Sequence, residues 1–131
     1  MEKYMFRAAQ EKDTALILQF IRELAEYEKL LDEVVATEEL LKEWIFDKKK
    51  AEVIFVLEDG VEAGFALFFH NFSTFLGRSQ TAVERGCGRL EWWCLDWNRP
   101  GIDFYLSLGA QPMEDWTVYR IAGDTLTKLA E

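Results

Sequence analysis

The side chains that most often carry catalysis are scarce in this sequence. His70 is the only histidine, and it ends a strand-like run. A zinc site with several histidine ligands is therefore excluded, and a Ser-His-Asp triad is not favoured. Two cysteines, Cys87 and Cys94, are too few for a disulfide framework or a cysteine-rich metal site. The sequence predicts no bound metal, so its chemistry must rest on other side chains.

The acidic residues are unevenly distributed along the chain. The formal net charge is -9, and 10 of the 24 Asp and Glu residues fall between Glu11 and Glu43, against four basic residues there. This balance argues against a nucleic-acid partner, because neutralising phosphates requires clustered Lys and Arg. Two interpretations of the acidic stretch remain. It is either the solvated surface of helices or a rim that attracts a cationic substrate.

Length and hydropathy bound the class of protein. With 131 residues, half of them hydrophobic, the chain is long enough for one domain with a core and too short for two. No run approaches the length that spans a bilayer, and the first residues lack the apolar stretch of a signal peptide. We therefore expect a single domain over residues 1–131, located in the cytoplasm and without a membrane partner.

The first half of the sequence alternates between strand and helix patterns. Patterns of β-branched and aromatic residues predict strands at residues 3–8, 52–58 and 61–72. Asp13 fits the N-cap of an amphipathic helix that reaches Tyr27, and a second helix is predicted from Thr37 to Phe46. Asp59-Gly60 is a strong signal for a tight hairpin turn between two strands.

The second half begins with a loop-like pattern at residues 71–81 and then returns to regular elements. Strands are predicted at 89–96 and 115–121. Pro100 suits the first turn of a helix that reaches Leu108, and Gly109 is its natural stop. Asp124 is expected to cap a short terminal helix. The fold class is therefore α+β, a mixed and largely antiparallel sheet flanked by helices.

One stretch of the second half carries a specific pattern. Trp97 to Ala110 reads WNRPGIDFYLSLGA. It resembles a motif of the GNAT superfamily of N-acetyltransferases, W-N-x-P-[SA]-I-x-F-Y-x-x-x-G-A, in which a strand ends, a helix starts at Asn and Pro, and a Tyr projects from that helix. Gly101 replaces the small Ser or Ala usual at its position, which is a mild departure.

Other stretches resemble the diamine and thialysine acetyltransferase branch of that superfamily. They are residues 21–41, residues 70–79 and the ending WTVYRIAGDTLTKLA. Together the resemblance covers roughly residues 3–79 and 82–131. It implies a GNAT-like acyl-CoA N-acyltransferase fold, acetyl-CoA as co-substrate and a homodimer.

The resemblance also implies the reaction, which is transfer of an acetyl group from acetyl-CoA to a primary amine of a small polyamine-like or lysine-like substrate. The CoA thiolate leaves more easily when it receives a proton. The resemblance gives that role to Tyr105, whose phenol is normally protonated at neutral pH. Packing beside Phe104 is the structural alternative. Asn98, Phe104 and Tyr105 are the implied cofactor-binding residues, and Asn98 also fits a helix N-cap.

Three residues match the substrate end of the branch: Tyr27, Glu28 and Trp116. A carboxylate and an aromatic face both attract an alkylammonium chain. The alternatives are an exposed helix acid for Glu28 and strand packing for Trp116.

The part of this family that binds phosphate is absent from the sequence. In the resembled branch a central strand, a glycine-rich loop and a helix follow the hairpin, and the loop N–H groups hold the CoA pyrophosphate. Here Ser79-Gln80-Thr81 runs directly into AVERGCGRLEWW. The glycines at 86 and 88 are not that loop, because a predicted strand and not a helix follows them. A segment of roughly 25 to 30 residues is therefore expected to be missing between about residues 79 and 82.

Three explanations of this gap remain. The sequence joins two stretches that are separated in the complete protein, or it carries a real deletion, or it belongs to a degenerate relative that kept the shell and lost the activity. The first is favoured, because removing a central strand exposes hydrophobic edges that invite strand exchange. The competing function is a non-catalytic dimeric binding module that keeps Glu28 and Trp116 as a cation site and cannot hold CoA.

Overall fold

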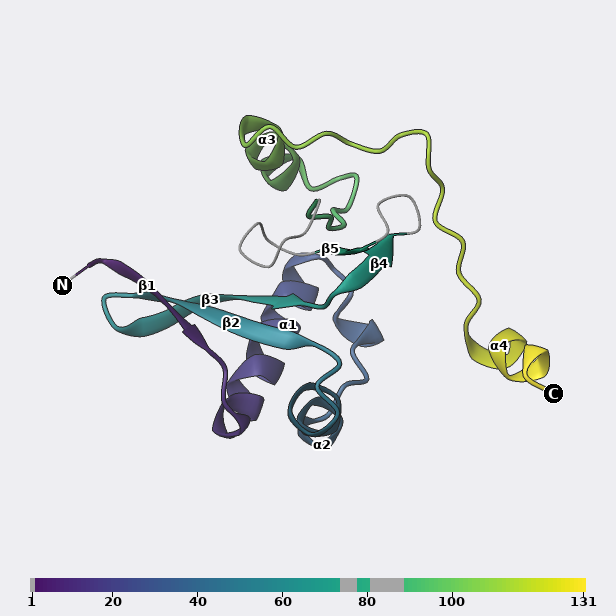
Figure 1. Cartoon of the computed structure of the whole chain (residues 1–131), viewed down its shortest axis with the longest axis horizontal. Helices are drawn as coiled ribbons and strands as arrows, with labels where there is room; N and C mark the ends of the chain where they lie inside the picture. The colour runs from purple at the N-terminus through teal and green to yellow at the C-terminus, as the bar shows by residue number, and fades with distance from the viewer. Residues whose placement is uncertain (1, 74–77, 81–88) are drawn as a thin grey trace. The chain divides into compact units, whose positions relative to one another are not determined.

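The computed structural model describes residues 2–73, 78–80 and 89–131, and its contacts divide the chain into two units, Met1–Trp93 and Cys94–Glu131 (Figure 1). The elements of the first unit are β1 (Tyr4–Ala8), η1 (Glu11–Asp13), α1 (Thr14–Tyr27), η2 (Leu31–Glu33), α2 (Glu38–Leu41), η3 (Lys42–Asp47), β2 (Glu52–Glu58), β3 (Val61–Phe68), β4 (Asn71–Ser73) and β5 (Arg78–Gln80). The second unit contains α3 (Arg99–Ser107) and α4 (Gly123–Leu129).

The strands β1, β2 and β3 form an antiparallel sheet with β2 in the middle (Figure 1). A bulge between Val56 and Leu57 shifts the register of the hairpin. The turn itself has positive φ at both central residues, 52° at Asp59 and 84° at Gly60. This is the geometry that matches the twist of the flanking strands, and it confirms the predicted hairpin.

The core of the first unit lies between this sheet and α1. Alternate residues of β2 point to the helix side, and Phe55 and Ile17 are completely buried there. The Phe20 ring joins them, with its centroid 5.9 Å from that of Phe55 and 5.6 Å from that of Phe65, on which it stacks. The helix covers one face of the sheet because its apolar residues recur at helical spacing, as predicted.

The second predicted helix, Thr37 to Phe46, is confirmed, but it begins as an α-helix and continues as a π-helix. The Thr37 hydroxyl caps α2 by accepting a hydrogen bond from the Leu40 N–H at 3.2 Å. After Leu41 the chain continues as the π-helical segment η3, in which Ile45 is buried in the core. The wider winding of a π-helix is usually limited to a single turn, as it is here.

Asp13 is the N-cap residue of α1, as predicted, but its side chain makes no cap hydrogen bond to that helix, because its carboxylate accepts from the Gln10 N–H at 2.7 Å instead. Another prediction in the first unit is wrong. Residues 71–81 were expected to be a loop, whereas β4 and β5 pair antiparallel within them. Short strands without strong β patterning form when a partner of matching register is adjacent.

Two strand predictions in the second half are also wrong. Neither residues 89–96 nor residues 115–121 form a strand in the part of the chain that the structure describes. A strand requires a neighbour for its backbone hydrogen bonds. Within residues 2–73, 78–80 and 89–131, neither segment is paired with a neighbouring strand.

Both helices predicted in the second unit are present. α3 begins beside Pro100 and ends before Gly109, whose φ is 93°, so the predicted helix and its stop are confirmed. α4 is also present, but Ala122 is its N-cap and Asp124 lies in its first turn. None of the helices described is both long and apolar enough to cross a membrane.

Candidate active site

The start of α3 is fixed by Asn98. Its Oδ1 accepts a hydrogen bond from the Gly101 N–H at 3.2 Å, and its backbone carbonyl accepts from the Ile102 N–H at 2.9 Å. Pro100 in the first turn has the φ that a helix requires and lacks an N–H that would need a partner. Asn98 is therefore the N-cap of α3, as the sequence predicted for its structural role.

Tyr105 lies on the same face of α3 as Asn98, because seven residues make two helical turns. That spacing corresponds to about 10 Å along the axis. Tyr105 is half-buried within the structure, whereas the neighbouring Phe104 is 58% exposed. Their ring centroids lie 5.8 Å apart. The three implied cofactor-binding residues are thus carried by one short helix and its cap.

The end of α3 holds Tyr105 in place through its backbone. The Ala110 N–H donates to the Tyr105 carbonyl at 3.1 Å, and the Gly109 N–H donates to the Leu106 carbonyl at 3.0 Å. This pair of bonds is the Schellman arrangement, which requires a left-handed residue after the helix. Gly109 supplies that conformation without the cost of a Cβ atom.

Tyr27 and Glu28 come together at the end of α1. The same Schellman arrangement closes this helix, with the Leu30 N–H donating to the Ala25 carbonyl at 2.8 Å. Here the left-handed residue is Lys29, at a φ of 61°. Tyr27 is half-exposed and Glu28 half-buried. Both lie at the negative end of the helix dipole, which favours a cation.

Trp116 belongs to the second unit and is not carried by a helix or strand. Trp116 is 69% exposed, and its backbone N–H donates to the Met113 carbonyl at 3.3 Å. The sequence-predicted residues therefore lie on three separate parts of the chain: α3 with its cap, the end of α1, and the turn that ends at Trp116.

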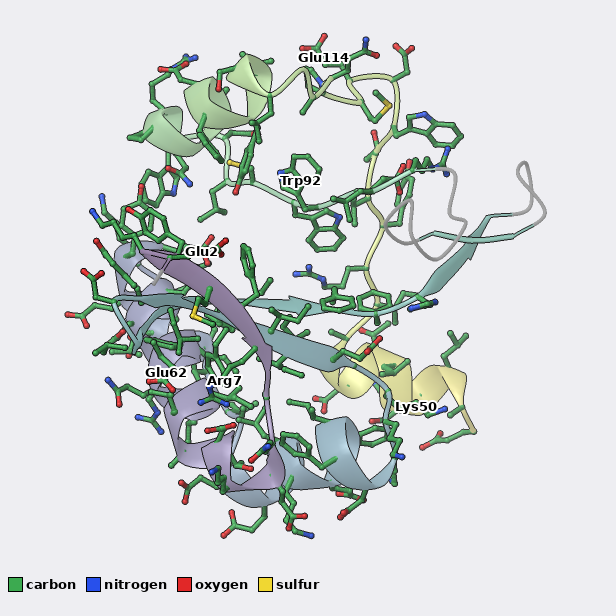
Figure 2. The ribbon with its side chains drawn as sticks, turned by 60° about the vertical axis from the view of Figure 1, so that its left-hand side comes forward. Glu2, Arg7, Lys50, Glu62, Trp92 and Glu114 are labelled. Carbon is green, nitrogen blue, oxygen red and sulfur yellow. The ribbon has the colours of Figure 1, made fainter. Side chains whose placement is uncertain are left out.

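Sequence reasoning missed one polar cluster, formed by Arg7, Asp13 and Glu62. Figure 2 labels two of its members, Arg7 and Glu62. The Arg7 guanidinium donates to both Asp13 oxygens at 2.8 and 2.9 Å and to Glu62 Oε1 at 2.7 Å. It also lies 4.8 Å from the centroid of the buried Phe55 ring. The cluster joins β1, the start of α1 and β3. A lone Arg in the apolar strand YMFRA was the signal for it.

Electrostatics in this cluster favour the charged forms. Hydrogen bonds from Arg7 hold the pKa of Asp13 below its usual range, even though burial acts in the opposite direction. The Gln10 N–H lowers the pKa of Asp13 further. Arg7 likewise lowers the pKa of Glu62, and the two carboxylates raise the pKa of Arg7. Asp13 is 8% exposed, so its ionised form depends on these partners.

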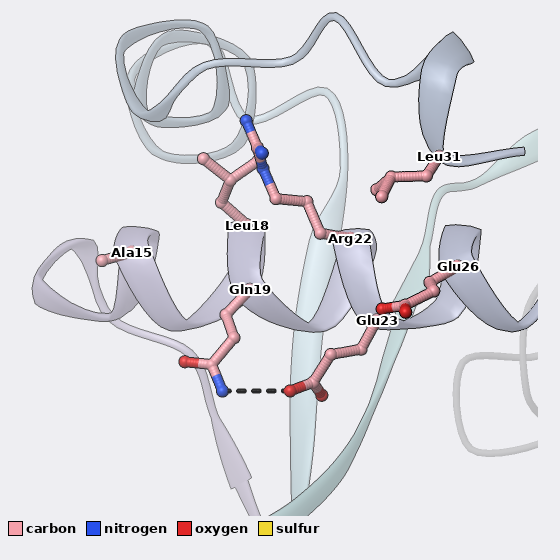
Figure 3. A pocket seen from close by; sticks show the side chains of 7 residues that line it. All are labelled: Ala15, Leu18, Gln19, Arg22, Glu23, Glu26 and Leu31. Atoms are coloured by element: carbon pink, nitrogen blue, oxygen red, sulfur yellow. Dashed lines mark hydrogen bonds between the residues drawn. The ribbon is translucent and has the colours of Figure 1, made fainter.

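A shallow pocket of about 360 Å³ lies on the outer face of α1 (Figure 3). Its lining residues are Ala15, Leu18, Gln19, Arg22, Glu23, Glu26 and Leu31. Gln19 donates to Glu23 at 3.2 Å across one helical turn. Neither Tyr27 nor Glu28 lines this pocket, so it does not join the predicted site residues.

The fold resembles that of several solved structures, some of which are named as acetyltransferases. An integron cassette protein from the mobile metagenome of V. cholerae superposes with a TM-score of 0.73 at 22% identity, covering 100% of this chain and 99% of that one. A ribosomal-protein-alanine N-acetyltransferase from Brucella melitensis biovar Abortus 2308 gives 0.67 at 15% identity, with 92% and 99% covered. A predicted acetyltransferase from Clostridium acetobutylicum, solved with acetyl-CoA, gives 0.56 at 15% identity, with 89% and 96% covered. These likenesses confirm the α+β acyl-CoA N-acyltransferase fold.

Sequence comparison defines the family more closely. The thialysine N-epsilon-acetyltransferase of Bos taurus is 31% identical over 96% of this chain and 96% of its own length. The L-ornithine N5-acetyltransferase of Arabidopsis thaliana is 34% identical over 53% of this chain and 42% of its own length. No family model matches the chain. The chain belongs to the GNAT superfamily of N-acetyltransferases, and within it resembles the thialysine branch.

The lengths of these alignments differ from the length of the chain. The match with the Bos taurus protein spans 164 positions, whereas 96% of 131 residues is about 126. The difference, 164 minus about 126, leaves about 38 positions that only the relative fills. The relative therefore carries residues inside the matched region that this chain lacks.

The residues described fit one part of acetyl-CoA. The amide of Asn98 suits the amide-rich arm of the coenzyme, and the phenol of Tyr105 suits its thiol end, since each supplies a hydrogen-bond donor. The pyrophosphate requires loop N–H groups at the start of a helix. Arg85-Gly86-Cys87-Gly88, which is not expected to fill that role, lies outside the described residues.

Proposed function

We propose that this chain transfers the acetyl group of acetyl-CoA to a primary amine of a small polyamine-like or lysine-like substrate. The observation that carries the proposal is its 31% identity to a thialysine acetyltransferase along 96% of both chains. The ornithine acetyltransferase of Arabidopsis thaliana supports the same class, because thialysine and ornithine are both amino acids with a side-chain amine. Glu28, at the negative end of α1, suits such a cationic substrate.

In this proposal acetyl-CoA supplies the activated acetyl group. The residues that bind the coenzyme and protonate its leaving thiolate are carried by α3 and its cap. Tyr105 carries a proton on its Oη and gives it to the departing thiolate. Asn98 hydrogen-bonds the amide arm. Phe104, exposed beside Tyr105, covers part of the coenzyme with its apolar ring.

The amine end is assigned to Tyr27, Glu28 and Trp116. Glu28 attracts the ammonium group of the substrate that does not react, and the two aromatic rings offer their faces to its alkylammonium chain. The reacting amine must be neutral to attack, so a base or a water chain accepts its proton.

We further propose that the additional residues of the relatives fall between about residues 79 and 82 of this chain. They would supply the central strand and the phosphate-binding loop. A single domain over residues 1–131 and a cytoplasmic location stay predictions. A homodimer is also proposed, and sedimentation at about twice the chain mass of 15.3 kDa checks it.

An amine panel tests the substrate class. Short diamines, polyamines and lysine analogues should be acetylated faster than neutral or acidic amines, because only the former complement Glu28. Glu28→Gln should raise KM for the amine more than it lowers kcat, since the carboxylate contributes binding in both ground and transition states. Glu26→Gln, two positions earlier on the exposed face, is the matched control and should leave KM unchanged. Neutral amino acids or sugars reacting fastest would contradict the proposal.

The non-catalytic binding module is not favoured, because the relatives that match nearly the whole chain are named as acetyltransferases. Titration calorimetry with CoA separates the two functions. The enzyme should bind CoA, whereas the module should bind diamines and no CoA.

A further inference from the structure

The strand β3 forms one edge of the antiparallel sheet, next to β2 (Figure 1). Among the residues that the structure describes, no backbone–backbone hydrogen bond joins residues 61–67 to any segment other than β2. The N–H and C=O groups of β3 that point away from β2 can therefore pair with another strand. The residues that only the relatives carry are proposed above to supply a strand after this hairpin, and this chain lacks them.

The two edges of the sheet differ in how well they are protected against such pairing. β1 is five residues long, contains Arg7 and follows Lys3, and charged side chains on an edge strand discourage pairing with another chain. The opposite edge reads GFALF over residues 64–68, with no charge and no proline. The register shift of the hairpin lies before Gly64, so these five residues pair with β2 in an unbroken register. The β3 edge is therefore the less protected of the two.

Residues 64–68 are complementary to a second copy of themselves. When two copies of β3 pair antiparallel about residue 66, Ala66 faces its own counterpart and Phe65 faces Leu67. The Phe65 ring stacks on Phe20 on the α1 side of the sheet, and Leu67 lies on that side too, since side chains alternate along a strand. The two Phe65–Leu67 pairs would thus extend the apolar core across the two-fold axis. Gly64 faces residue 68, and it has no side chain to obstruct a ring there.

We propose that the β3 edge at residues 64–68 is a dimer interface, and that it pairs with the same residues of a second copy of this chain. Two three-stranded sheets then join into one continuous antiparallel sheet. The contact is isologous, because the same surface of each copy takes part, as in most symmetric dimers. Leu67, which is 42% exposed in the single chain, becomes covered. This inference rests on the homodimer proposed above and names its surface, and it is independent of acetyl transfer.

Sedimentation equilibrium of the whole chain and of its Ala66→Lys variant tests the interface. Ala66 is exposed, and its side chain lies on the face of the sheet opposite α1, because it follows Phe65 in the strand. The single chain should therefore tolerate lysine, which circular dichroism and denaturation check. In the dimer two ammonium groups would face each other across the axis, so the dissociation constant should rise roughly 10-fold or more. Ala8→Lys, at an exposed alanine of β1, is the matched control and should leave it unchanged.

A cysteine at the same position tests the register. Under mild oxidation Ala66→Cys should form a disulfide between the two copies of residue 66, because opposed residues of antiparallel strands have Cα atoms about 4.5–5.5 Å apart. Peptide mapping by mass spectrometry separates this bond from any that involves Cys87 or Cys94. Ala8→Cys should give no link between the two copies of residue 8.

Each outcome decides a separate point. A parent chain that sediments as a 15.3 kDa monomer at every concentration overturns both the homodimer and this interface, and leaves the test of acetyl transfer unaffected. A dimer that survives Ala66→Lys, or that Ala8→Lys dissociates equally, forms through another surface. If Ala66→Lys dissociates the dimer but residue 66 does not link to its counterpart, a different segment pairs with the edge, such as residues 115–121 of the second copy. The inference is wrong in each of these cases.

Discussion

In the first unit the Phe55 side chain is completely buried between the sheet and α1, whereas in the second unit the Trp116 and Tyr119 side chains are 69% and 91% exposed. Both regions have sequence patterns rich in β-branched and aromatic residues. β2 has a strand on each side, β1 and β3. Residues 115–121 have no paired strand in the part of the chain described.

This contrast shows that a segment with a strand-like sequence forms a strand only where a neighbouring strand pairs with it. The backbone N–H and C=O groups of an extended segment are satisfied by the adjacent strand, and its apolar face is buried only when a sheet exists. In the first unit the middle strand of the sheet, β2, has a partner strand on each edge, β1 and β3. The relatives fill about 38 alignment positions that this chain does not, and we propose that a partner strand for the second unit lies among them.

Hydrogen exchange should separate the two regions by the largest margin. Amides in β2 that pair with both neighbours should exchange roughly 10³- to 10⁴-fold more slowly than those at 115–121, if opening the sheet costs about 5 kcal/mol. NMR or mass-spectrometric exchange on the purified chain measures both. Equal protection in the two segments would contradict the comparison.

Inserting the relative's additional residues between Gln80 and Thr81 sharpens the same comparison. The insert should protect residues 115–121 from exchange and lower KM for acetyl-CoA by roughly 10²- to 10⁴-fold, as two charge-assisted hydrogen bonds to phosphate would do. A Gly/Ser insert of the same length is the control. If both inserts act alike, the residues absent from this chain do not supply the phosphate loop.

Truncating one aromatic side chain in each region gives the next largest effect. Phe55→Ala should lower the free energy of unfolding by about 3–5 kcal/mol, because it leaves a cavity in a closed core. Trp116→Ala should change it by less than about 0.5 kcal/mol, since most of that ring faces solvent. It should instead raise KM for the amine. Chemical denaturation and steady-state kinetics measure these effects, and a Trp116→Ala loss as large as that of Phe55→Ala would refute the comparison.

Removing the charge of Arg7 should lower the free energy of unfolding of the first unit by a smaller amount. The size of this loss should depend on pH. At neutral pH Arg7→Met should cost about 3 kcal/mol, because it leaves the buried Asp13 carboxylate without its cation. Arg22→Met, an exposed change on α1, is the control and should cost little.

The sign of the pH dependence follows from the lowered pKa values of Asp13 and Glu62. A carboxylate whose pKa is lower in the folded protein than in the unfolded chain stabilises the folded state at pH values above the unfolded pKa, which is near 4. This stabilisation is lost as the pH falls through the pKa of the folded protein. The difference between parent and Arg7→Met should therefore shrink below about pH 4. A constant difference from pH 7 to pH 2 would show that Arg7 acts through packing alone.

Local signals in the sequence predicted the elements whose partners are also local. The hairpin at Asp59-Gly60, α1, and α3 with its stop at Gly109 depend on residues within a few positions, and all are confirmed. The predicted strands at 89–96 and 115–121 depend on a distant partner, and both are wrong.

The candidate site follows the same division. Asn98 as a cap and its grouping with Tyr105 on one helix follow from spacing. The lone Arg in the strand YMFRA signals that a charged partner is needed, but one of its partners, Glu62, lies 55 positions away in sequence, so no short pattern identifies that partner. The contact between Asn98 and Gly101 depends on the Pro100 that removes the nearer donor, which is a local rule that the motif alone does not state.

The most direct test of the account is acetyl transfer by the purified chain and by its Tyr105→Phe variant. The assay combines acetyl-CoA with thialysine or a short diamine and measures product by mass spectrometry. The account predicts turnover by the parent and a fall in kcat of roughly 10²- to 10⁴-fold in the variant, with folding and CoA affinity retained, since only the proton donor is lost. Turnover of the variant at the parent rate would contradict the role of Tyr105. A parent that binds CoA and amine and yields no acetylated product would contradict the proposed function itself.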